Sequence, residues 1–165
     1  GYIVSGQDNA TLDTLGAHDN WFNKTSGTYG VFPVTEGLIL ANVGNLNGTL
    51  YIKTKNNATL FIGGNAGGGP QYLFNVSNCD VANCSYANSV KDEFPACTDT
   101  GSFIMNSFVD APYLESGPGT KICDQFGFSP DGNELRIDLR IVIPKDAPTV
   151  EKGDTITATA EIPNP

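Results

Sequence analysis

A chain of 165 residues is the size of one ordinary domain, and its 39% apolar residues suffice for one hydrophobic core. Its 18 acidic and 9 basic side chains give a net charge of −9, which would repel a nucleic acid or any other polyanion. It contains no run of 18 apolar residues and no basic amphipathic helix, so we expect no membrane insertion of the mature chain.

The N-terminal part of the chain looks like that of a secreted protein. It begins at Gly1 with no initiator Met or charged leader, as a chain does after a signal peptide has been removed, although a trimmed chain is the alternative.

Four aromatic residues lie near the N-terminus. Rings of this kind can stack on sugars, although core or interface packing is their commoner use. These residues are Trp21, Phe22, Tyr29 and Phe32.

Apolar residues recur with a period of two along the chain, which predicts strands and no helix. Residues 37–43 and 49–53 are the first clear strands, and the Asn47-Gly48 pair between them suits a tight hairpin turn. A third strand over residues 58–62 would complete an antiparallel meander. Residues 65–70 and 75–100 are predicted as loops.

The clearest strand is Glu134–Ile143, where Leu and Ile alternate with mostly charged residues. This alternation predicts one face in the core and the other in solvent. Asp154–Ile162 alternates in the same way and predicts a second half-buried strand. Weaker strand candidates are residues 103–105, 108–109 and 122–128. Seven to nine short strands of this kind predict an all-β, single-domain antiparallel β-sandwich, either a jelly roll or an immunoglobulin-like fold.

Four cysteines, an even number, indicate two disulfides, and hence an oxidising compartment or a hyperthermophile source, in which internal disulfides are tolerated. They are Cys79, Cys84, Cys97 and Cys123. Three pairings are possible, and we prefer Cys79 with Cys84 and Cys97 with Cys123 because this pairing closes the loops locally. A zinc site is less favoured, because the single histidine, His18, is far from the cysteines in sequence.

The acceptor motif for N-linked glycans, Asn-X-Ser/Thr, occurs six times. The acceptors are Asn9, Asn23, Asn47, Asn57, Asn75 and Asn83. Together with the cysteines they predict a glycosylated, extracellular domain. No motif follows Ser85, so protein contacts are most available in the second half of the chain.

No pattern of residues in the sequence predicts catalysis. A triad with His18 would need an activated serine, and the sequence has no GxSxG motif to supply one. The glycine-rich residues 63–69 lack the lysine and the helix that follow the glycines of a phosphate-binding loop. Calcium could bind carboxylates in predicted loops, at Asp80, Asp131 or Asp154, but no EF-hand pattern supports it. We therefore expect a protein that is not an enzyme and that holds no cofactor or metal.

The C-terminal residues 135–144, a Pro-containing polar loop and residues 153–160 resemble the closing hairpin of archaeal extracellular filament subunits. These are the bundling-pilus and thread proteins, which are similar to TasA-type bacterial matrix fibres. The resemblance implies donor-strand complementation, in which an N-terminal segment of one subunit fills a groove in the next. Residues 1–15 would be the donor segment and residues 16–165 the sandwich domain. The implied anchors are Tyr2, Val4, Leu12 and Leu15.

Physical reasoning gives the same kind of assembly, because a sandwich that lacks one strand exposes an unpaired edge and an apolar groove. An extended segment of a neighbour fills such an edge, and a head-to-tail contact that does not close produces a filament. We therefore expect a cell-surface filament or pilus subunit for adhesion, cell contact or biofilm, whose partners are identical subunits and N-linked glycans. The alternatives are a secreted monomeric carbohydrate-binding or adhesin domain, a viral coat or surface-layer jelly roll, and, least of all, a secreted hydrolase.

Overall fold

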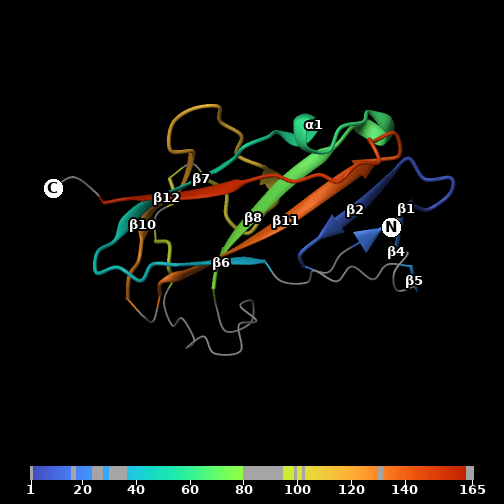
Figure 1. The fold of residues 1–165 in the computed structure, drawn as a ribbon. Helices are drawn as coiled ribbons and strands as arrows, with labels where there is room; N and C mark the ends of the chain where they lie inside the picture. Colours follow the sequence, from blue (N-terminus) through green and yellow to red (C-terminus); the bar gives the residue numbers. More distant parts are fainter. Residues whose placement is uncertain are drawn as a thin grey trace.

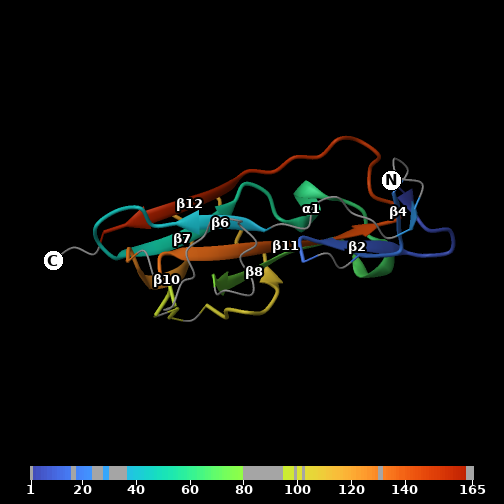
Figure 2. The same cartoon turned by 90° about the horizontal axis from the view of Figure 1, so that it is seen from below.

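The computed structural model of the chain describes residues 2–15, 18–23, 28–29, 37–79, 95–98, 100–101, 103–129 and 132–162. The expected all-β sandwich is confirmed: two antiparallel sheets pack against each other. The molecule is elongated, with its N-terminal end at one end of the long axis and its C-terminal end at the other (Figure 1). Figure 2, turned by 90°, shows β12 above β11, β2 and β8.

The larger sheet is built around one long strand, β11 (Glu134–Pro144). Along one side β11 pairs with β8 (Gln71–Asn78). Along its other side two strands lie end to end, since β6 (Leu38–Ala41) pairs with the first half of β11 and β2 (Asn9–Asp13) with the second half. The short strands β3 (His18–Asp19) and β9 (Val109–Asp110) pair with β2 and β8 respectively.

The smaller sheet has the order β10 (Thr120–Phe126), β7 (Gly48–Thr54) and β12 (Ile156–Glu161). The register of β10 shifts twice along β7, which marks irregular or bulged pairing. A separate small sheet near the N-terminal end joins β1 (Tyr2–Ile3), β4 (Trp21–Asn23) and β5 (Thr28–Tyr29).

The core lies between the two main sheets and follows the period of two in each strand. The alternate residues Leu50 and Ile52 of β7 face inward, as do Tyr72, Phe74 and Val76 of β8. Leu135 and Ile137 of β11 and Ile122 and Phe126 of β10 complete the buried cluster. The rings of Tyr72 and Phe74 meet edge to face, with centroids 5.4 Å apart.

The prediction of a strand over residues 58–62 is wrong, because Ala58–Phe61 form one helical turn, α1. Asn57 caps this turn by accepting a hydrogen bond from the backbone N–H of Leu60 at 2.9 Å. A second short helix, η1 (Ala66–Gly68), is of the 3-10 type. Among the described residues, neither helix is long and apolar enough to cross a membrane.

The predicted meander is also wrong, because β6 pairs with β11 while β7 belongs to the other sheet. The connection over residues 42–47 therefore crosses from one sheet to the other. The predicted loop over residues 75–100 is wrong at its start, since β8 extends to Asn78 and supplies the centre of the core.

The two C-terminal strands form where expected, but they are not a hairpin. β11 belongs to the larger sheet and β12 pairs with β7 in the smaller one. β12 is also less buried than predicted: its inward row shares a face with Leu50 and Ile52, yet Ala158 and Ala160 are exposed. Ile156, at the start of this row, does pack against the core.

Phe74→Ala should lower the free energy of unfolding by about 3 to 5 kcal/mol, because it removes a ring that is 1% exposed and leaves a cavity between the sheets. Chemical denaturation monitored by circular dichroism measures this loss. The control is Leu60→Ala on α1, which is 60% exposed and should change stability by less than about 0.5 kcal/mol. Equal losses in both variants would contradict this description of the core.

Candidate functional site

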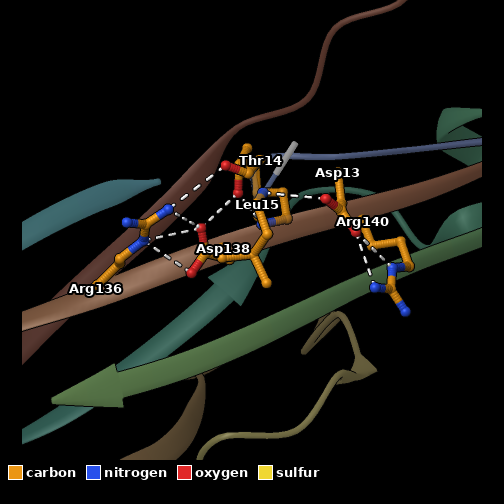
Figure 3. A network of polar contacts seen from close by, with 7 residues as sticks. Asp13, Thr14, Leu15, Arg136, Asp138 and Arg140 are labelled. Carbon is orange, nitrogen blue, oxygen red and sulfur yellow. Dashed lines mark hydrogen bonds and ion pairs between the residues drawn. The ribbon is translucent and has the colours of Figure 1, made fainter. Parts of the chain in front are cut away.

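A buried ion-pair network lies on the outer face of the larger sheet, where the sequence predicts solvent (Figure 3). Arg136 and Asp138 project from the same face of β11, and their side chains are 8% and 2% exposed. The Arg136 Nε donates to both carboxylate oxygens of Asp138, at 3.0 and 2.9 Å. The Thr14 hydroxyl donates to Asp138 Oδ1 at 2.7 Å and accepts from the backbone N–H of Leu139 at 3.0 Å.

A second ion pair extends this network toward the N-terminal end. Arg140 donates through Nε and a terminal nitrogen to Asp13 Oδ2, at 3.1 and 2.8 Å, and lies 3.9 Å from the centre of the Phe108 ring. Asp13 in turn accepts from the backbone N–H of Leu15. The two arginines of the chain therefore both bind carboxylates here, and two positive charges balance two negative ones.

The network corrects the expectation that the charged face of β11 faces solvent. The turn after β2 covers Arg136 and Asp138, and Gly37 lies against them so closely that a Cβ there would be 2.7 Å from Asp138 Oδ1. Buried charges are tolerated when they are paired and hydrogen-bonded, as these are. The same contacts bind the end of β2 to β11 within one chain.

The candidate donor segment is therefore partly built into its own domain. Leu12 is 3% exposed within β2, which pairs with β11 of the same chain, so residues 9–13 form a strand of their own sandwich in the single chain. The backbone of Tyr2 belongs to β1, Val4 is half-buried and Leu15 is 52% exposed. Leu12 and Leu15 thus do not lie in one apolar row.

An apolar groove of about 660 Å³ lies toward the N-terminal end of the molecule. Ile141 and Ile143, near the end of β11, line it, and both also pack against the core cluster. Its walls come from four further parts of the chain. They are residues 3–7, Trp21, Phe61 with Ile62, and residues 147–150 with Lys152.

Hydrogen bonds and an ion pair fix the rim of the groove. The Lys145 side chain binds the Asp8 carboxylate, which raises the pKa of the lysine. Asp146 accepts backbone N–H bonds from Ala66 and Asn65, and these bonds hold the pKa of its carboxyl below the ordinary value. These contacts join β11, the η1 loop and the N-terminal segment at one edge of the groove.

A second groove of about 310 Å³ lies beside the first and shares Phe61 and Ile141 with it. Tyr72 and Asp154 line it, and burial, with a smaller contribution from Asp154, raises the pKa of the Tyr72 hydroxyl. Asp154 also accepts a hydrogen bond from Asn56 at 2.8 Å, which fastens the start of β12 to the end of β7.

Exposed apolar residues gather at the opposite end of the molecule, where β12 finishes. Ala158, Ala160 and Ile162 follow one another on the inward row of β12, and Ile162 is 71% exposed. We call residues 158–162 the tail. The tail lies at the C-terminal end of the long axis in both views, away from the groove (Figures 1 and 2).

The described residues contain no group of three or more His, Cys, Asp or Glu side chains placed to hold a metal ion. Comparison with protein-family models, curated proteins and solved structures finds no match for this chain. Of the calcium candidates, Asp154 makes the contacts given above, whereas Asp80 and Asp131 lie outside the described residues.

The preferred pairing of Cys97 with Cys123 is confirmed, with an S–S distance of 2.14 Å and Cα atoms 5.8 Å apart. This disulfide fastens the segment after residue 95 to β10 beside the core. Cys79 is buried just after β8. Its expected partner, Cys84, lies outside the described residues, so that pairing stays a prediction.

The glycan acceptors differ in their surroundings. Asn47 is exposed, and its Nδ2 points to Gln125 of β10 at 3.4 Å. Asn9 donates to the Gly67 carbonyl oxygen, and Asn57 serves as the helix cap described above. Asn75 lies within β8 with its Oδ1 buried. The backbone of Asn23 belongs to β4, and Asn83 lies outside the described residues.

Local pattern does not predict the groove, because residues 3–7 and 141–152 that line it are more than 100 residues apart. The signal for the network is the alternation of charges on β11, Arg136-x-Asp138-x-Arg140, together with Asp13 at the end of β2 and Thr14 directly after it. Of the aromatic residues proposed to stack on sugars, Trp21 lines the groove and Phe32 lies outside the described residues. Phe22 and Tyr29 belong to the small N-terminal sheet.

Asp138→Ala should lower the free energy of unfolding by about 3 to 5 kcal/mol, because it leaves the buried guanidinium of Arg136 without this carboxylate. The control is Asp124→Ala, which removes an ion pair with Lys121 whose side chains are 42% and 29% exposed. That change should be below about 1 kcal/mol. Urea titrations of both variants measure the difference, and equal, small effects would contradict the structural role of the network.

Proposed function

We propose that this chain is a structural subunit of an extracellular filament or pilus, in which copies join head to tail by β-strand donation. The observation that carries the proposal is the open apolar groove at one end of the sandwich. A groove lined by Ile141 and Ile143 leaves apolar surface in contact with water unless another segment covers it. An extended strand from a neighbouring copy suits an opening of this shape and chemistry.

Three features outside the groove support an extracellular, assembled protein. The Cys97–Cys123 disulfide suits an oxidising compartment, and the six glycan motifs suit an extracellular one. Such filaments would serve adhesion, cell contact or biofilm formation. The resemblance of the C-terminal residues to archaeal bundling pili and threads supports the same proposal, although the two strands concerned lie in different sheets.

A second candidate function follows from Trp21, which lines the same groove. A tryptophan ring in a groove of about 660 Å³ could stack on a sugar, as in a monomeric carbohydrate-binding domain or adhesin. The chain has a single tryptophan, so its fluorescence reports directly on the groove. Quenching or a blue shift of this fluorescence by added oligosaccharide, in a protein that stays monomeric, would favour this alternative.

Val150→Arg should abolish assembly if the groove is the acceptor. Val150 lines the groove and is 63% exposed, so the substitution brings a long charged side chain to the groove without disturbing the core. Sedimentation velocity and electron microscopy of the purified protein measure assembly. The expected result is filaments from the native chain and monomers from the variant.

The control for this variant is Ile104→Arg, because Ile104 is 62% exposed and does not line the groove. It should assemble like the native chain. A native chain that stays monomeric at every concentration would contradict the filament proposal, and so would filaments of normal length from Val150→Arg.

We also expect the native protein to carry N-linked glycans, so its intact mass should exceed the 17.5 kDa of the polypeptide. Asn47→Gln should remove one glycan, since Asn47 is exposed in the connection between β6 and β7. Mass spectrometry of protein purified from its native source measures both. A native mass equal to that of the polypeptide would contradict glycosylation.

A further inference from the structure

We propose that the tail of one copy, residues 158–162, enters the groove of the next copy beside residues 149–153. This inference rests on the proposed filament function and names the two surfaces that meet. It assigns the donated strand to the C-terminal end of the chain.

The tail is an exposed strand end with an uncovered apolar row. β12 lies at the edge of the smaller sheet and pairs with β7 along one side. From Ile156 to Ala160 it has no charged residue, proline or bulge, which are the usual devices that protect an edge. Ala158, Ala160 and Ile162 are exposed although they belong to the inward row, so their apolar surface has no cover from the described residues of the chain.

The groove offers both a backbone edge and an apolar lining to such a strand. Residues 149–153 belong to the connection between β11 and β12 (Figure 1), and Thr149, Val150 and Lys152 line the groove. Within the described chain no hydrogen bond joins the backbone of residues 149–153 to another residue. Their N–H and C=O groups can therefore pair with an added strand, as in β-augmentation. Val150 and Ile143 provide apolar surface for its side chains.

Charge complementarity identifies the occupant as a second copy of this chain. In a protein of net charge −9, the charged residues among those that line the groove are two lysines, Lys145 and Lys152. Lys145 binds Asp8, which leaves Lys152 as the cation that faces an incoming strand. The tail carries one charge, at the exposed Glu161. Side chains alternate along a strand, so with Ile162 in the groove Glu161 lies at its rim, where Lys152 can bind it.

The positions of the two surfaces also fit a polymer. The tail and the groove lie at opposite ends of the long axis, so the contact is heterologous and can repeat without closing (Figure 1). The Asn47 side chain points toward β10, whereas the tail pairs with the other side of β7.

The first test is a charge exchange in the full chain. Glu161→Lys and Lys152→Glu should each raise the protein concentration needed for assembly by about tenfold at low salt, since each places like charges together. A chain that carries both substitutions restores an opposite-charge pair at every contact and should assemble within about threefold of the native concentration. Sedimentation velocity measures assembly, and a blue shift of Trp21 emission reports filling of the groove.

The apolar part of the contact has a matched control. Ile162→Ser should weaken assembly, whereas Ile104→Ser should not, although the two isoleucines are similarly exposed at 71% and 62%. Normal assembly of Ile162→Ser and of both single charge variants would overturn this inference and leave the filament proposal standing. The inference is also overturned if the two substitutions together raise the concentration needed for assembly by as much as their two separate effects combined. A native chain that does not assemble overturns the filament proposal itself.

Discussion

The buried contact between Arg136, Asp138 and Thr14 sets the register of the larger sheet. A shift of β2 along β11 by one residue would remove the Thr14 hydroxyl from the Asp138 carboxylate and turn Leu12 out of the core. Buried charges whose partners are removed are costly, so this network selects one pairing among the many that alternating strands allow. β11 can then pair with β8 on one side and with β6 and β2 on the other.

The length of β11 has a consequence for assembly. This strand has 11 residues, whereas its counterparts β7 and β12 in the smaller sheet have seven and six, and the two sheets overlap only over part of its length. The groove lies toward the end of the molecule where β11 extends past the smaller sheet, and the tail lies at the other end, where β12 extends past the larger one (Figure 1). In the proposed assembly the groove is the acceptor and the tail is the donor. Their positions at opposite ends of the molecule suit a head-to-tail polymer.

The sequence predicts those parts of the fold that depend on local pattern. The period of two identifies the strands that include residues 49–53, 134–143 and 156–161, and local loop closure gives the Cys97–Cys123 disulfide. The period of two gives a wrong prediction at residues 58–62, where the Asn57 cap favours a helical turn over the strand that the composition indicates. It also misses β8, because the second half of this strand is predicted to belong to a loop over residues 75–100. It also cannot give strand partners or the groove, since these join segments far apart in sequence. The charged face of β11 is misjudged because alternation alone does not tell a solvated face from one covered by a distant turn.

Thiol cross-linking can detect the proposed contact between the tail of one copy and the groove of the next. A chain with both Val150→Cys and Ile162→Cys, assembled and treated with a short bifunctional thiol reagent, should give a ladder of covalent multimers on a denaturing gel. Val150 lines the groove and Ile162 belongs to the tail, so a ladder requires contact between copies. We expect a long ladder from the chain with both substitutions and at most dimers from either single variant. Intact filaments that give no ladder would contradict the proposed contact.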